Sequence, residues 1–147
     1  MRPAVLLLLT AVACADAEPD AEPAVSTALT AAQVNGTWSG RSMMVDSDSV
    51  LSTWTFASNS DTTGGVVFTG ATDTIWYSTW FDGDSVVATS MPYADPGSPA
   101  GQPVMVTFRS VGRLLDGRMV GTSAQRLADR PDSVVSRDRW EASRVTQ

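Results

Sequence analysis

The chain has 147 residues and a net charge of −6, and it contains neither histidine nor lysine, so all ten basic residues are arginines. This acidic balance argues against a nucleic-acid partner, which requires a basic face. The lack of histidine excludes Ser-His-Asp and Cys-His catalysis and the usual zinc sites, and the lack of lysine excludes Schiff bases. We therefore expect a binding protein that is not an enzyme and that carries no metal or cofactor.

The N-terminus carries Arg2, an apolar run over residues 4–13, and Cys14, the only cysteine of the chain. The run is shorter than the roughly 20 apolar residues that cross a bilayer, and its small-residue end is typical of a cleaved signal. Residues 11–14, Ala-Val-Ala-Cys, resemble the lipobox of bacterial lipoproteins, with alanine where leucine is commoner. The resemblance implies a signal peptide over residues 1–13 and a lipid on Cys14 that attaches the protein to a membrane.

The residue after the cysteine is Ala15, which in Gram-negative sorting resembles a lipoprotein of the outer membrane, facing the periplasm. The alternative is an ordinary secretory signal, cleaved at an Ala-x-Ala site over residues 11–13 or 13–15. Residues 14–32 are rich in alanine, proline and acids, and Leu29 is their only large apolar residue. This composition predicts a lipidated, disordered linker, and residues 33–147 are long enough for one compact domain.

The domain is predicted to be all-β, because runs of Val, Thr, Trp, Tyr and Phe with a period of two lie between turn-forming residues. Eight strands are expected, over residues 36–45, 50–58, 66–69, 74–81, 85–91, 104–115, 118–127 and 133–144. Asp82-Gly83-Asp84 and Asp116-Gly117 are the strongest hairpin signals, and no stretch shows helical periodicity with caps. We expect an eight-stranded antiparallel up-and-down barrel or a barrel-like meander.

The expected fourth strand is apolar on both faces. Tyr77 and Phe81 share one face, and Trp76 and Trp80 share the other. One face must meet the core, and the other must be covered or must offer a surface for association.

The first expected strand opens with Gly36-Thr37-Trp38, and this motif in an eight-stranded meander resembles the calycins: lipocalins, fatty-acid-binding proteins and avidins. The resemblance implies that Gly36 allows a tight start of the strand and that Trp38 plugs the closed end of a barrel. It also implies an arginine of the last strand over that ring, for which the chain offers Arg137, Arg139 and Arg144. The lipocalin Thr-Asp-Tyr motif and C-terminal helix are absent, and the biotin contacts of avidins cannot be placed.

The residues that we predict to bind a ligand share faces of three strands. Trp54 and Phe56 lie on one face of the second, and Phe108 lies on the sixth. Ser136, Asp138 and Trp140 lie on one face of the eighth, and a buried Asp138 would need a partner such as Arg109, Arg126 or the ligand. The alternative interpretation is that the aromatic residues simply fill the core.

Other carboxylates are interpreted as structural. Asp138 and Glu141 lie on opposite faces of the last strand, which is unsuitable for a glycosidase pair, and we expect them to form surface ion pairs with Arg137, Arg139 or Arg144 of the same strand. Asp46 and Asp48 could offer oxygens to calcium, but they lack the acidic loop pattern of known sites and are interpreted as turn formers.

Two functions follow from these observations. The first is binding of a small hydrophobic or amphiphilic molecule inside the barrel of an envelope lipoprotein, without catalysis. The alternative is a structural or assembly module that binds another envelope protein through Trp76, Trp80 or the loop over residues 92–103. An open mouth above Trp54, Phe108 and Trp140 would favour the first, and a filled core would favour the second.

Overall fold

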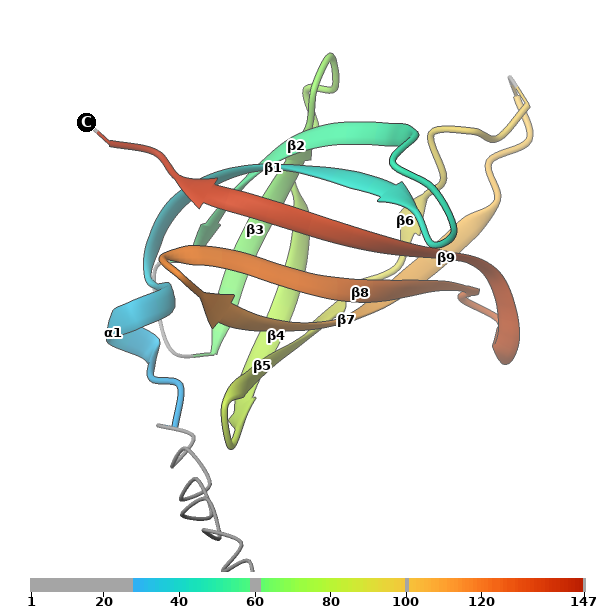
Figure 1. The fold of residues 1–147 in the computed structure, drawn as a ribbon. Coiled ribbons are helices and arrows are strands. Elements are labelled where there is room, and N and C mark those ends of the chain that lie inside the picture. Colours follow the sequence, from blue (N-terminus) through green and yellow to red (C-terminus); the bar gives the residue numbers. More distant parts are fainter. Residues whose placement is uncertain (1–27, 59–61, 100, 147) are drawn as a thin grey trace, which may run out of the picture.

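The computed structural model describes residues 28–58, 62–99 and 101–146 (Figure 1). The predicted signal peptide, Cys14 and most of the predicted linker lie outside these residues. The elements are α1 (Ala31–Val34), β1 (Gly36–Met44), β2 (Val50–Ser58), β3 (Thr63–Phe68), β4 (Ile75–Asp82), β5 (Ser85–Ser90), β6 (Tyr93–Ala94), β7 (Met105–Leu115), β8 (Arg118–Leu127) and β9 (Arg130–Arg144).

The strands form one antiparallel sheet in the order β5-β4-β3-β2-β1-β9-β8-β7-β6. Pairing between β5 and β7 closes this sheet into a barrel of eight strands, and the two-residue β6 is added on β7. The predicted all-β, eight-stranded barrel is confirmed, and it is compatible with the lipocalin-like fold that the resemblance implies. Closure also pairs the edges of the sheet, which an open meander would leave exposed.

The two Asp-Gly turns lie where the sequence predicts them. Leu115 pairs directly with Arg118 across a two-residue turn, in which Asp116 and Gly117 have φ values of 50° and 77°. Gly83, with φ of 58°, lies in the turn between β4 and β5. Both hairpins therefore need residues that tolerate positive φ, which is why aspartate and glycine occupy them.

Trp38 plugs one end of the barrel and is only 1% exposed. Its indole Nε1 donates a hydrogen bond to the Val34 carbonyl at 2.7 Å, and its ring stacks on Phe56 with centroids 6.0 Å apart. The guanidinium of Arg144 lies 4.5 Å from the ring centroid and donates hydrogen bonds to the carbonyls of Asn35 and Gln33. Of the three candidate arginines, Arg144 therefore covers the tryptophan, and cation–π attraction contributes there.

The folded unit begins before the predicted boundary at Gln33. Leu29 is buried in the core, and its backbone N–H donates a hydrogen bond to the Gly83 carbonyl at 2.9 Å. The short α1, which was not predicted, follows it and carries Val34 to the barrel. In the part of the chain that the structure describes, no helix has the length and apolar character needed to span a bilayer.

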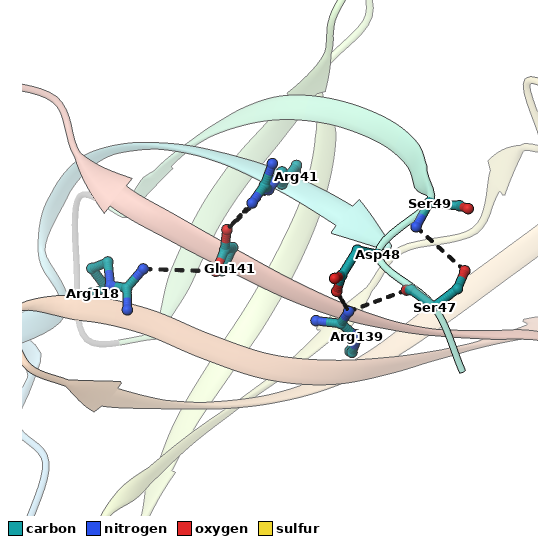
Figure 2. A network of polar contacts seen from close by, with 7 residues as sticks. All are labelled: Arg41, Ser47, Asp48, Ser49, Arg118, Arg139 and Glu141. Carbon is teal, nitrogen blue, oxygen red and sulfur yellow. Dashed lines mark hydrogen bonds and ion pairs between the residues drawn. The ribbon is translucent and has the colours of Figure 1, made fainter. Parts of the chain in front are cut away.

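The outer face of β9 carries ion pairs that join neighbouring strands (Figure 2). Glu141 pairs with Arg41 of β1 at 2.6 Å and with Arg118 of β8 at 3.8 Å. Arg139 pairs with Asp48 and donates a hydrogen bond to the Ser47 carbonyl at 3.1 Å. Glu141 is thus a surface carboxylate, as predicted, although its partners come from β1 and β8 and not from β9. The same prediction is wrong for Asp138, which lines the inside of the barrel. Such exposed pairs contribute little to stability.

Candidate ligand-binding cavity

The barrel is hollow. A cavity of about 690 Å³ extends from Val34 and Met119 near the Trp38 plug to Asp95 and Pro96 in the loop between β5 and β7. Sites that enclose a drug-sized molecule have volumes of roughly 300–1,000 Å³. All the residues that we predicted to contact a ligand line this cavity: Trp54, Phe56, Phe108, Ser136, Asp138 and Trp140. The structure therefore brings them together, while contact with a ligand stays a prediction.

Glycines on the wall leave room for the large rings. Gly40 of β1 pairs with Trp54 of β2, and Gly121 of β8 pairs with Trp140 of β9. A Cβ atom on Gly40, on Gly121 or on Gly112 of β7 would overlap the adjacent tryptophan ring. The rings therefore lie over glycine backbone along the wall instead of filling the lumen, which is how Trp54 and Trp140 coexist with an open cavity.

Serine hydroxyls fix the orientation of the two cavity tryptophans. The indole Nε1 of Trp54 donates to Ser42 Oγ at 3.1 Å, and that of Trp140 donates to Ser110 Oγ at 2.8 Å. The two rings meet edge to face, with centroids 5.9 Å apart and planes at 73°. Each buried N–H has a partner, so the rings present mainly apolar surface to the lumen.

Asp138 is half-buried and projects into the cavity from β9. Removal from water raises the pKa of its carboxyl group, and a hydrogen bond with Ser42 opposes this effect. Neither predicted arginine reaches it: Arg109 lies 5.9 Å from the Trp80 ring on the outer face, and Arg126 donates to the Pro131 carbonyl at 2.7 Å. Strand alternation explains the position of Arg109. Its neighbours Phe108 and Ser110 line the cavity, so Arg109 faces outward.

The mouth includes residues that we did not predict, notably Tyr93 of β6 and Gln125 of β8. Gln125 Nε2 donates to the Tyr93 hydroxyl at 3.2 Å, and Ser136 Oγ donates to Gln125 Oε1 at 3.0 Å. The Tyr93 ring meets Phe108 edge to face, with centroids 6.2 Å apart. Tyr93 is the only aromatic residue of the Pro-Gly loop over residues 92–103, which is the one signal in the sequence that could have identified it.

The two faces of β4 differ in their exposure to solvent. Ile75 and Tyr77 are buried on the inner face, whereas Trp76 and Trp80 are 60% and 45% exposed on the outer face. Tyr77 lines the cavity near Phe108, with ring centroids 6.3 Å apart, and burial raises the pKa of its hydroxyl. The inner face therefore contributes to the cavity, and the outer tryptophans contribute nothing to it.

Among the described residues, acidic side chains do not gather into a metal centre. Within residues 28–58, 62–99 and 101–146, no three side chains of His, Cys, Asp or Glu are grouped in a way that could hold a metal ion. Asp48, which we considered as a calcium ligand, is paired with Arg139 (Figure 2).

In comparisons with protein-family models, curated proteins and solved structures, nothing matches this chain. The evidence for its function therefore comes from the geometry of the cavity.

Proposed function

We propose that this protein is an envelope lipoprotein whose barrel binds a small hydrophobic or amphiphilic molecule without catalysis. The observation that carries the proposal is the cavity of about 690 Å³, which is lined by aromatic rings and a few polar groups. Binding removes apolar ligand surface from water at roughly 25 cal/mol per Å², and the polar groups at the mouth orient the ligand.

The test uses N-phenyl-1-naphthylamine, a neutral dye whose fluorescence rises in apolar surroundings, with the full chain. Ala88 of β5 lines the cavity, so Ala88→Trp should occupy the lumen and abolish the increase in dye fluorescence. Thr89→Trp is the matched control, because it adds the same ring to the next residue, which faces outward by strand alternation. Equal dye binding by both variants would exclude binding inside the barrel.

The attachment to a membrane is a separate part of the proposal, and its support is the lipobox-like sequence that ends at Cys14. We expect the protein to fractionate with outer membranes and its N-terminal peptide to carry acyl chains in mass spectrometry. The variant Cys14→Ser should lose both properties and retain dye binding. An unmodified N-terminus on the wild-type protein would refute the lipid anchor and leave the binding proposal untouched.

A second candidate is an assembly module that binds another envelope protein. The exposure of Trp76 and Trp80 on the outer face favours it, whereas the filled barrel that it predicted does not agree with the cavity. The double variant Trp76→Ser and Trp80→Ser separates the two functions. It should retain dye binding if the cavity is the functional site, and it should lose cross-linking to an envelope protein if this surface is.

A further inference from the structure

The charged side chains that line the cavity are all of one sign. Asp95 and Asp138 line it, and no arginine does so in the part of the chain that the structure describes. Arg41 and Arg118 instead pair with Glu141 on the outer face, Arg109 lies over Trp80, and Arg144 covers Trp38 at the closed end. A ligand with a carboxylate or sulfate group would therefore meet two negative charges and no counter-charge.

Asp138 lies at the depth where a ligand headgroup would be held. Along β9, Trp140 pairs with Ser42 and Arg144 with Trp38, so Asp138 lies farther from the closed end than either. Its hydrogen bond with Ser42 fixes the carboxylate, but Ser42 carries no charge. A half-buried carboxylate without a cation is costly, and a cationic ligand would remove that cost.

Aromatic faces surround the space next to the two carboxylates. Tyr93 is held by Gln125 and packs edge to face against Phe108. Burial raises the pKa of Tyr93, the hydrogen bond with Gln125 opposes this effect, and the nearby charges of Asp95 and Asp138 add to it. Electron-rich rings beside carboxylates are the surroundings that recognise quaternary ammonium groups.

The deeper part of the cavity suits an apolar tail. Trp54, Phe56 and Val66 line it from β2 and β3, and Met119 and Trp140 line it from β8 and β9. The indole N–H groups of both tryptophans already donate hydrogen bonds to serines. An alkyl chain that excludes water there would therefore leave few polar groups without a partner.

We propose that the ligand is an organic cation with an apolar tail, whose ammonium group lies between Asp138, Asp95 and Tyr93 and whose tail extends toward Trp54 and Trp140. This inference rests on the proposed function, because it names the class of molecule that the cavity takes.

The experiment compares three molecules that share one alkyl chain: decyltrimethylammonium, decanol and decanoate. Each displaces N-phenyl-1-naphthylamine from the full chain, below its micellar concentration. The cation should bind about tenfold more tightly than decanol, and decanoate should bind most weakly. Equal affinity for the cation and decanol, or the tightest affinity for decanoate, would overturn the inference.

Charge-neutral variants assign the effect to the cavity. Asp138→Asn should weaken binding of the cation about tenfold and Asp95→Asn about threefold, while decanol affinity stays unchanged and shows that the barrel is folded. Asp129→Asn removes the same charge from the β8–β9 turn, outside the cavity lining, and should have no effect. If Asp138→Asn behaves like Asp129→Asn, the inference fails, although dye and decanol binding would still uphold the proposed function. If the dye does not bind to the wild-type protein, both fail.

Discussion

Replacing Trp38 with phenylalanine should lower the free energy of unfolding by about 2–4 kcal/mol. The variant keeps an aromatic ring at the closed end but removes the indole N–H, which leaves the buried Val34 carbonyl without its 2.7 Å hydrogen bond. An unsatisfied buried acceptor costs about 1–3 kcal/mol. The smaller ring also leaves a void and a weaker contact with the Arg144 guanidinium, which together add about 1 kcal/mol.

Urea unfolding followed by far-ultraviolet circular dichroism measures this change, and an unaltered m-value would show that the loss lies in the folded state. The matched control is Trp76→Phe, the same substitution at a tryptophan that is 60% exposed, and it should change stability by less than about 0.5 kcal/mol. If the two variants lose the same free energy, the account of the closed end is wrong, because hydrogen bonding and burial at Trp38 would then contribute nothing.

Three further perturbations test the segment before the barrel, the cavity wall and the buried carboxylate. Leu29→Ala should cost about 2–3 kcal/mol in urea unfolding, because the side chain is buried; no loss would mean that this segment is not docked in solution. Gly112→Ala should push the Trp140 ring into the lumen, reducing both dye binding and, by about 1–3 kcal/mol, stability; unchanged dye binding would contradict this. Because burial raises the pKa of Asp138, its contribution to stability is fully present below its unfolded pKa and is lost as pH rises through its folded pKa. The unfolding free energy of Asp138→Asn minus that of the wild type should therefore rise as the pH increases from about 4, the ordinary pKa of an unfolded aspartate, and a flat difference would refute the assignment.

The strands and hairpins were predictable because each depends on neighbours in the sequence. Alternation places Trp54 and Phe56 on one face whatever the partner strand, and the Asp116-Gly117 turn needs only residues that tolerate positive φ. The six predicted ligand-binding residues line one cavity for the same reason. Arg144, which covers the Trp38 ring, is one of the three arginines that the resemblance to the calycins suggested for this position.

Other features depend on contacts between distant segments, so no local pattern carries them. Leu29 looked like an isolated apolar residue in a polar linker, and its burial depends on the β4–β5 turn around Gly83. Tyr93 belongs to a Pro-Gly loop that predicts no strand, and it reaches the mouth because β6 pairs with β7. The sequence also could not tell whether the barrel is filled or hollow. This depends on the strand register that places Gly40 opposite Trp54 and Gly121 opposite Trp140.

That register also determines how the volume of the cavity can change. In most cores, enlarging the interior means removing a large side chain and losing its contacts. Here the rings of Trp54 and Trp140 lie against Gly40, Gly112 and Gly121, so the capacity of the lumen depends on the absence of a side chain at these three glycines. A methyl group added at Gly112 would meet only the side chains of Trp140 and Met119, so it would displace the Trp140 ring and narrow the lumen. At Gly40 or Gly121 it would also overlap a backbone carbonyl. The volume of the cavity can therefore change through Gly112, while the aromatic rings and the two carboxylates that line it stay the same.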